Sequence, residues 1–196
     1  MPGKRKRDPK GTRERLVRAA LELFTTEGYH SATTPLIASR AGIAEGTIYR
    51  HFESKEHLLN EIYRAAVRLL AAPVNESPNS EGCNGRLRRI AAVWQEIAIA
   101  NPPLIKLVFN GNMDGLLDSR SSAAFDNMLQ DLETVIVAGK AGGEVRAGSA
   151  RIWADVWLRL TVLILERVAS GEWPPDHPGP QQVLNSAWTA IGAPTP

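Results

Sequence analysis

The sequence predicts an all-α protein, in which a small three-helix head is followed by a larger helical body. Apolar residues recur three and four positions apart through most of the chain, and no stretch of any length alternates as a strand would. Clusters of Gly, Pro, Ser and Asn separate these periodic segments. With 196 residues the chain can bury a good core, and about nine helices are expected.

Residues 33–52 have the pattern of two short helices joined by a tight turn, which is a helix-turn-helix. Thr34 is the candidate N-cap of the first helix, and Pro35 suits its first helical position, where a missing N–H costs nothing. Gly42 follows at the place where a helix ends in a left-handed residue. The first helix therefore has both a start and a stop signal.

A second helix is expected from Glu45, because Ile48 and Phe52 are four residues apart and would share one face. That face would pack inward, and the first helix would brace the second. The opposite face would expose small, hydroxyl and cationic groups, which are Gly46, Thr47 and Arg50, flanked by Tyr49 and His51.

This stretch resembles the DNA-binding head of the TetR-like (tetracycline-repressor-like) transcription regulators. The resemblance covers about residues 12–60 and is dense, whereas the rest of the chain is similar to that family only in length and helical rhythm. It implies an all-helical homodimer that binds operator DNA and releases it when a small molecule binds. The matching residues are Thr33-Thr34, Ile37-Ala38, Ala41-Gly42-Ile43, Gly46-Thr47-Ile48-Tyr49, His51-Phe52, Ser54-Lys55 and Leu58.

Two positions near the second helix bear on DNA binding. Ala44 stands where the family usually places a capping Ser, so no side chain accepts from the first N–H groups of the helix. Either bound phosphate satisfies these groups, or the start of the helix is locally unstable. Lys55 lies at the start of the next helix, an unfavourable place for a cation unless a phosphate is its partner. The family uses a Lys at this position in that way.

The candidate DNA-binding residues follow from this motif and from the chemistry of each side chain. Gly46 would let the backbone approach base edges, and Thr47 and Tyr49 could donate to phosphate. Arg50 could read guanine or contact phosphate, and Glu45 could accept from cytosine or only favour the helix dipole. The full candidate set is Thr33, Thr34, Glu45, Gly46, Thr47, Tyr49, Arg50, His51 and Lys55.

Charge is distributed unevenly, although the whole chain carries a net charge of only +2. Residues 1–64 hold 12 Lys and Arg against 8 Asp and Glu, whereas residues 65–196 carry a net charge of −2. The basic excess therefore accompanies the helix-turn-helix, as phosphate neutralisation requires. Residues 1–10 form a basic arm, which is either a disordered end or a segment that tracks phosphates or enters a minor groove. The expected head spans residues 11–53 and the body residues 54–196.

The body is expected to begin with a helix from Ser54 to about Ala72, which would link it to the head. A loop is predicted over residues 73–85, and Cys83 within it is interpreted as an incidental thiol and not a redox sensor. One cysteine also excludes an internal disulfide framework. The following helices are predicted over residues 86–100, 104–110, 119–140, 150–170 and 181–191.

Two functions are assigned to the body. A pocket for a small, apolar or aromatic effector is predicted between its helices, although each lining residue could equally be ordinary core. Its candidates are Trp94, Ile97, Ile105, Phe109, Met113, Phe125, Met128, Trp157 and Thr161. The last two helices are expected to form a two-fold dimer interface, because the first of them is apolar on too many sides for one chain to cover. The interface candidates are Trp153, Val156, Leu160, Leu163, Ile164, Val168, Leu184, Trp188 and Ile191.

Other functions find little support in the sequence. No nucleophile triad, metal-ligand cluster or Gly-rich phosphate loop is visible, so neither an enzyme nor a cofactor or metal is expected. No signal peptide and no membrane span are visible, and a cytoplasmic location is expected. A ligand-independent helix-turn-helix protein remains an alternative. An activator is another, since the assignment as a repressor rests only on what is typical of the family.

Overall fold

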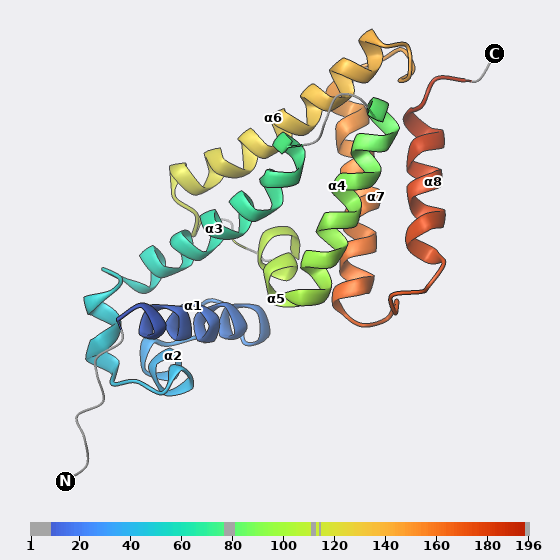
Figure 1. Ribbon diagram of the computed structural model, residues 1–196. Coiled ribbons are helices and arrows are strands. Elements are labelled where there is room, and N and C mark those ends of the chain that lie inside the picture. The colour runs from blue at the N-terminus through green and yellow to red at the C-terminus, as the bar shows by residue number, and fades with distance from the viewer. Residues whose placement is uncertain (1–8, 77–80, 111–112, 114, 195–196) are drawn as a thin grey trace.

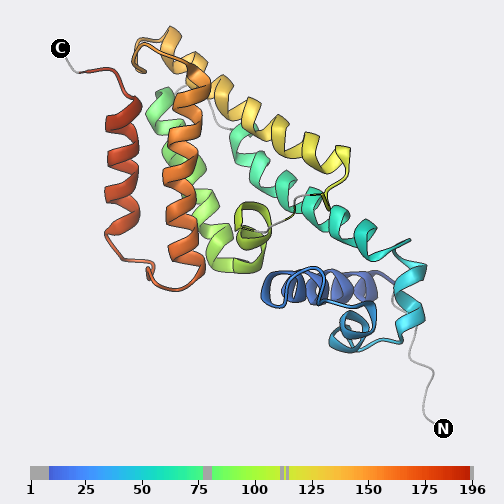
Figure 2. The same ribbon diagram turned by 180° about the vertical axis from the view of Figure 1, so that it is seen from behind.

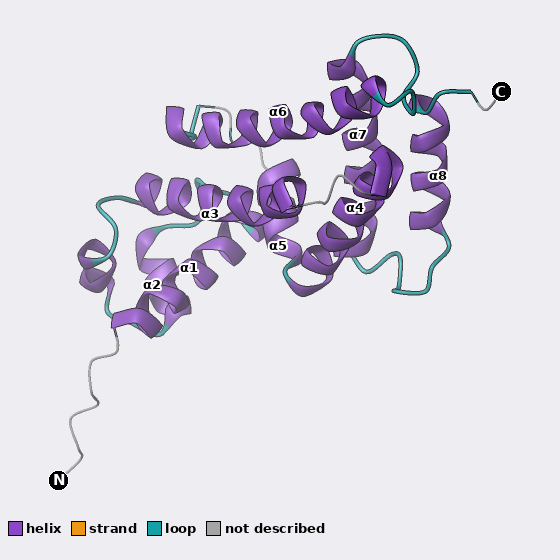
Figure 3. Ribbon diagram, turned by 45° about the horizontal axis from the view of Figure 1, so that its top comes forward, coloured by secondary structure: helices purple, strands orange, loops and turns teal. Residues whose placement is uncertain are grey.

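The structure is a computed structural model that describes residues 9–76, 81–110, 113 and 115–194. Within those residues it is all-α, as predicted, and its one β-bridge pairs Val145 with Gly192 (Figure 3). The head lies at one end of the molecule and the body at the other (Figure 1). Residues 1–8 of the predicted basic arm lie outside the described part of the chain.

The head consists of α1 (Pro9–Thr26), α2 (Thr34–Ala41) and η1 (Glu45–Arg50). Helix α1 begins before Thr12, whose hydroxyl accepts a hydrogen bond from Arg15 at 3.3 Å. The N-cap predicted for α2 is wrong by one residue. Thr33 caps it, with its side chain accepting from the N–H of Leu36 at 3.4 Å.

The second element of the motif is a 3₁₀-helix and not the α-helix that was predicted through Phe52. Its hydrogen bonds run three residues back, from Thr47 to Ala44 at 2.9 Å and from His51 to Ile48 at 2.9 Å. Three weaknesses explain the tighter form: Ala44 provides no side-chain cap, Gly46 is a poor helix former, and the element is only six residues long. Ile48 and Phe52 are nevertheless both buried.

Helix α3 (Lys55–Glu76) connects the head to the body, and Ser54 caps it by accepting from the N–H of His57 at 3.0 Å. It continues past the predicted end at Ala72 and contains Pro73. Proline removes one helical hydrogen bond, but Pro73 and Val74 are both buried, and that packing keeps the last turn helical.

The loop predicted over residues 73–85 is wrong at both ends, with residues 77–80 outside the described part. Helix α4 (Gly82–Ala100) begins four residues before its predicted start at Arg86. The carboxylate of Glu144, distant in sequence, accepts the backbone N–H of Cys83 with both oxygens, at 2.8 and 3.0 Å. This contact supplies the N-terminal acceptor that the local sequence lacks. Cys83 is buried in this helix and not exposed in a loop.

The buried position of Cys83 leads to a testable expectation. Burial, reinforced by the nearby Glu144, raises the pKa of the thiol from 9.0 to about 11. At about pH 8 the folded protein therefore holds about a hundredfold less thiolate than an exposed cysteine, and a disulfide reagent should react far more slowly than in urea. Because the pKa of the Cys83 thiol is raised in the folded protein, the buried neutral thiol contributes fully to the free energy of unfolding below pH 9. This contribution is lost as the pH rises towards about 11. Similar reaction rates in the folded and unfolded protein would contradict this burial.

The remaining elements form the rest of the body. They are α5 (Pro102–Ile105), the π-helix η3 (Lys106–Asn110), α6 (Ser119–Ala141), α7 (Ala150–Ala169) and α8 (Gly179–Ile191). The predicted helix over residues 104–110 is thus divided in two, and α8 starts two residues earlier than predicted. Asp118 caps α6, and Ser149 caps α7. The two views of Figures 1 and 2 agree that α8 covers one side of α7, while α4 and α6 pack on others.

One continuous set of buried apolar side chains runs through head and body. Leu58, Leu59 and Ile62 in the first half of α3 are buried, and so are Val67, Leu70 and Val74 further along the helix, which contacts α1 of the head and α4 and α6 of the body. Helix α3 therefore joins the two parts by packing as well as by the chain. None of the described helices has the length and apolarity that a membrane crossing requires.

Candidate nucleic-acid interface

The turn between α2 and η1 has the geometry of a helix-turn-helix. Gly42 adopts the left-handed conformation at φ 66° and ψ 41°, and its N–H bonds back to Ala38 and Ser39. The N–H of Ile43 also returns to the carbonyl of Ala38, at 3.0 Å. Any L-residue with a side chain would be strained at Gly42, so the turn angle depends on this glycine.

The buried side of the motif is fully packed, which leaves its other side to face outward. Ile37 of α2 and Ile48 of η1 are 0% exposed, whereas Tyr49 is 55% exposed. A Cβ built at Gly46 would meet no atom within 4 Å, so open space lies directly over the backbone of η1 there. This arrangement suits a surface that must approach another molecule closely.

The structure brings the predicted DNA-binding residues to one region of the head. Thr34 and Tyr49 join the two helices of the motif, with their hydroxyl oxygens 3.3 Å apart. Arg50 is exposed and forms no ion pair among the described residues. Of the predicted set, Thr33, Glu45, Gly46, Tyr49 and Arg50 are exposed, and Thr34, Thr47, His51 and Lys55 are half-buried.

Lys55 differs from the others because it already has an internal partner. Its Nζ donates to the carbonyl of Tyr29 at 2.9 Å and lies 4.2 Å from the centre of the Tyr29 ring. Burial lowers the pKa of this ammonium. An ammonium has three donors, so two stay available for a phosphate. The sequence pattern gave no sign of the contact with Tyr29, which lies 26 residues earlier.

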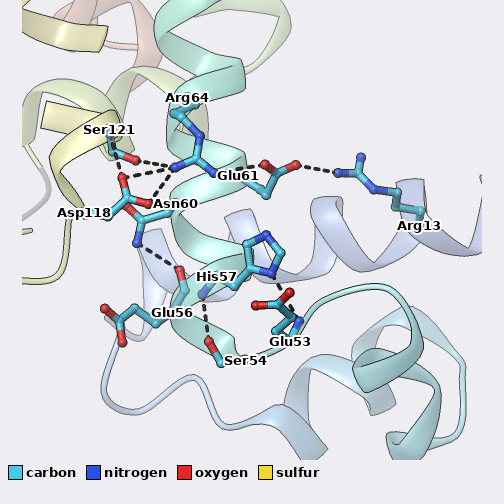
Figure 4. A network of polar contacts seen from close by, with 10 residues as sticks. All are labelled: Arg13, Glu53, Ser54, Glu56, His57, Asn60, Glu61, Arg64, Asp118 and Ser121. Atoms are coloured by element: carbon cyan, nitrogen blue, oxygen red, sulfur yellow. Dashed lines mark hydrogen bonds and ion pairs between the residues drawn. The ribbon is translucent and has the colours of Figure 1, made fainter. Parts of the chain in front are cut away.

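A polar network that the sequence analysis missed connects α3 to the start of α6 (Figure 4). Asn60 is 2% exposed, donates to the carbonyl of Leu116 at 3.0 Å and accepts from the N–H of Asp118 at 2.8 Å. Arg64 donates to both carboxylate oxygens of Asp118, at 2.9 and 3.1 Å, and to Ser121 at 3.0 Å. An Asn within the apolar face of α3 was the available signal, since a buried amide needs partners.

The same network reaches back into the head. Arg64 also donates to Glu61 at 3.0 Å, and the second oxygen of Glu61 accepts from Arg13 of α1 at 2.9 Å (Figure 4). The hydrogen bond from Arg64, with the charges of Arg64 and Arg13, lowers the pKa of Glu61 against the opposing effect of burial. Side chains of α1, α3 and α6 are therefore linked in one chain of contacts.

The aromatic side chains predicted to line an effector pocket do come together in the body. We refer to Trp94, Phe109, Phe125 and Trp157 as the aromatic cluster; ring centres lie 5.8 Å apart for Trp94–Trp157, 6.2 Å for Trp94–Phe109 and 6.3 Å for Phe109–Phe125. Ile97 lies elsewhere, on a cavity between α3 and α4. The other candidates Ile105, Met113, Met128 and Thr161 are buried.

The predicted dimer residues divide into two groups. Ile164, Leu184 and Ile191 are at most 8% exposed within the single chain, so their burial needs no partner. The half-buried group is Trp153, Val156, Leu160, Leu163, Val168 and Trp188. Ile152 is 57% exposed on the same helix and was missed by the sequence analysis. Together with Val156 and Leu160 it forms a stripe of residues four apart along α7.

Comparison with known proteins agrees with this geometry. Residues 16–62 match the family model described as bacterial regulatory proteins, tetR family. The regulator TcmR of Streptomyces glaucescens is 37% identical over 84 residues, covering 39% of this chain and 36% of the relative. The repressor KstR of Rhodococcus jostii is 29% identical over 167 residues, or 82% and 76% of the two chains. The chain thus spans about a third of the length of the first of these curated relatives.

Solved structures are similar in fold over almost the whole chain. A TetR family transcription regulator from Marinobacter aquaeolei has a TM-score of 0.79 at 18% identity, covering 94% of this chain and 97% of its own. One from Shewanella has a TM-score of 0.72 at 22% identity, covering 93% and 99%. The helix-turn-helix geometry and the family match over residues 16–62 show that the head is a TetR-type helix-turn-helix domain, and the whole chain shares the all-α fold of the solved TetR family regulators.

Proposed function

We propose that the protein is a repressor that binds a palindromic operator as a homodimer and is released by a small-molecule effector. The observation that carries the proposal is the outward face of η1, where the bare backbone at Gly46 adjoins the exposed side chains of Tyr49 and Arg50. Such a face can enter a major groove closely while the hydroxyl and cationic groups contact phosphates and bases. One relative, KstR of Rhodococcus jostii, is itself named a repressor.

The dimer would form through α7 and α8. The half-buried stripe of Val156, Leu160 and Leu163, extended by the exposed Ile152, leaves apolar surface on the outside of α7. Trp188 of α8 adds a half-buried aromatic ring. A two-fold axis through this surface would bring the same patch of each chain together, which is how isologous dimers are built. Two heads could then meet successive major grooves about 34–36 Å apart.

Release would depend on the connection through α3. A small, apolar or aromatic effector bound near the aromatic cluster would shift the helices that pack against it, and α6 is one of them because it carries Phe125. The start of α6 is held to α3 by Asn60 and Arg64. A displacement of α6 would therefore move α3 and the head attached to it. By linkage, operator DNA must weaken effector binding by the same factor.

Selection of bound sequences from random DNA by the purified protein tests this function. The expected outcome is a palindrome whose half-sites are separated by about one helical turn. The absence of any preferred sequence, or a single asymmetric site occupied by one chain, would contradict the proposal.

Replacing Lys55 separates phosphate contact from internal packing. Lys55→Met should weaken binding to all DNA sequences about equally and flatten the dependence of log affinity on log salt by about one unit. It should also lower the free energy of unfolding by about 1 kcal/mol, since the hydrogen bond to Tyr29 is lost. Fluorescence anisotropy at several salt concentrations measures the slope. A destabilised protein with an unchanged slope would show that Lys55 serves only Tyr29.

Arg64→Met should break the polar network. We expect a loss of about 1–3 kcal/mol in the free energy of unfolding, because the carboxylates of Glu61 and Asp118 lose their charged donor. The pKa of Glu61 is lowered in the folded protein, so its stabilisation exists above the unfolded pKa and is lost as the pH falls through the folded value. The variant should lose less stability on acidification than the wild type in urea melts. Arg159→Met, at an exposed site on α7 without an ion pair among the described residues, is the matched control.

A further inference from the structure

A groove of about 590 Å³ lies between the head and the body. It is lined by Thr25 and Thr26 at the end of α1, by Pro102 and Pro103 at the start of α5, and by the last turn of α7. Figures 1 and 2 both show these three helix ends side by side. Its volume falls within the range of small-molecule sites, about 300–1,000 Å³. We call it the head–body groove.

Two helices point their C-terminal ends into this groove. Thr25 and Thr26 are the last residues of α1, and Ser170 is the C-cap of α7. Each C-terminus carries the negative end of a helix dipole and favours a cation. The hydroxyls of Thr25 and Thr26 donate to carbonyls of their own helix, so their remaining lone pairs add acceptors to the groove wall.

The charged side chains of the groove also favour a cation. Glu166 is half-buried and has no ion-pair or hydrogen-bond partner for its carboxylate among the residues the structure describes. Arg167 is already paired with Glu172. Lys106 is exposed, so its charge is hydrated and screened. A half-buried carboxylate without a partner is the group that a bound cation would satisfy best.

The third wall explains why the ligand should also be apolar. Helix N-termini usually offer N–H groups to anions, but Pro102 and Pro103 have none. They contribute hydrocarbon surface instead, as do Ile105 and Ala169. The groove therefore combines acceptors and one unpaired carboxylate with apolar walls, and its charged donors are the exposed Lys106 and the already paired Arg167.

We propose that the head–body groove binds a lipophilic organic cation, at a site separate from the aromatic cluster of the body. Because the groove takes one wall from the head and two from the body, a cation bound there contacts both. The affinity of the groove for the cation must then differ between orientations of the head that open the groove and orientations that close it. By linkage the same cation adjusts operator affinity by an equal factor, independently of an effector bound inside the body.

Tetraphenylphosphonium and tetraphenylborate provide a direct test, since they share size and shape but carry opposite charges. Isothermal titration of the full chain should show one phosphonium bound per chain and the borate at least about tenfold weaker. Glu166→Gln should weaken phosphonium binding about fivefold, whereas Glu96→Gln, the same change at an exposed site on α4, should not. Ser170→Trp, at an exposed residue of the groove wall, should abolish binding by filling the space.

Equal binding of both ions would overturn the proposal, because the groove would then select apolar surface and not charge. Phosphonium binding that survives both Glu166→Gln and Ser170→Trp would place the cation elsewhere and would also overturn it. Unchanged thermal unfolding of the two variants shows that the fold is intact. Operator binding measured without any added cation tests the proposed repressor function separately, so the two failures are distinguishable.

Discussion

Leu160→Glu should convert the protein to a monomer and lower its affinity for a palindromic operator by about a thousandfold or more. Leu160 is half-buried in the apolar stripe of α7, so the side chain can turn outward without disturbing the core of its own chain. In a dimer, however, the new carboxylate would be buried against its symmetry mate, which is costly without a partner charge. A single remaining head would read only one half-site.

Sedimentation at micromolar concentration and operator titration measure the two effects. Ile99→Glu is the matched control, because it introduces the same carboxylate at an exposed apolar residue of α4 that is not part of the stripe on α7. It should stay dimeric and keep operator affinity. A Leu160→Glu protein that remains a dimer with full operator affinity would show that the interface lies on another surface.

Trp94→Ala should lower the free energy of unfolding by about 3–5 kcal/mol, the range for removing a large aromatic side chain from a core. Trp94 is 0% exposed, lies between Phe109 and Trp157, and donates from its indole Nε1 to the carbonyl of Leu70 at 2.8 Å. The substitution therefore opens a cavity in the aromatic cluster and leaves a buried carbonyl on α3 without its donor.

Urea unfolding measures this loss, with Ile99→Ala as the control on the same helix. Ile99 is 55% exposed, so its truncation should change stability by less than about 0.5 kcal/mol. Indole should bind the cavity and restore part of the lost stability, because a dry apolar cavity of this kind accepts a matching aromatic. A loss below about 1 kcal/mol for Trp94→Ala would contradict the packing described for the cluster.

Much of the head could be predicted from sequence because its signals are local. Gly42 marks the turn, Ser54 caps α3, and the spacing of Ile48 and Phe52 places both in the core. The helix type of the second element of the motif was harder to predict from its local sequence. The uncapped Ala44 was noticed, but its combination with Gly46 in a six-residue element produces a 3₁₀-helix and not an α-helix.

The errors in the body arise from contacts between residues far apart in sequence. The start of α4 depends on Glu144, which lies 61 residues after Cys83. The residues near Gly82 therefore carry no sequence signal for the start of this helix. Pro73 remains helical because the surrounding core buries it. A helix that is apolar on several sides does not show from sequence alone which side its own chain covers. The structure shows that Ile164, Leu184 and Ile191, three of the candidates for the dimer interface, are buried within the single chain.

If the outward backbone of η1 approaches DNA closely, Gly46→Ala should weaken operator binding without disturbing the fold. A Cβ at this position meets nothing within 4 Å and the residue has no positive φ, so the variant should fold with unchanged or slightly raised thermal stability. Anisotropy titration of the selected palindrome should nevertheless show affinity reduced about tenfold or more, because the added methyl would stand between backbone and bases. Wild-type affinity in a normally folded Gly46→Ala protein would show that the backbone of η1 does not approach the bases closely.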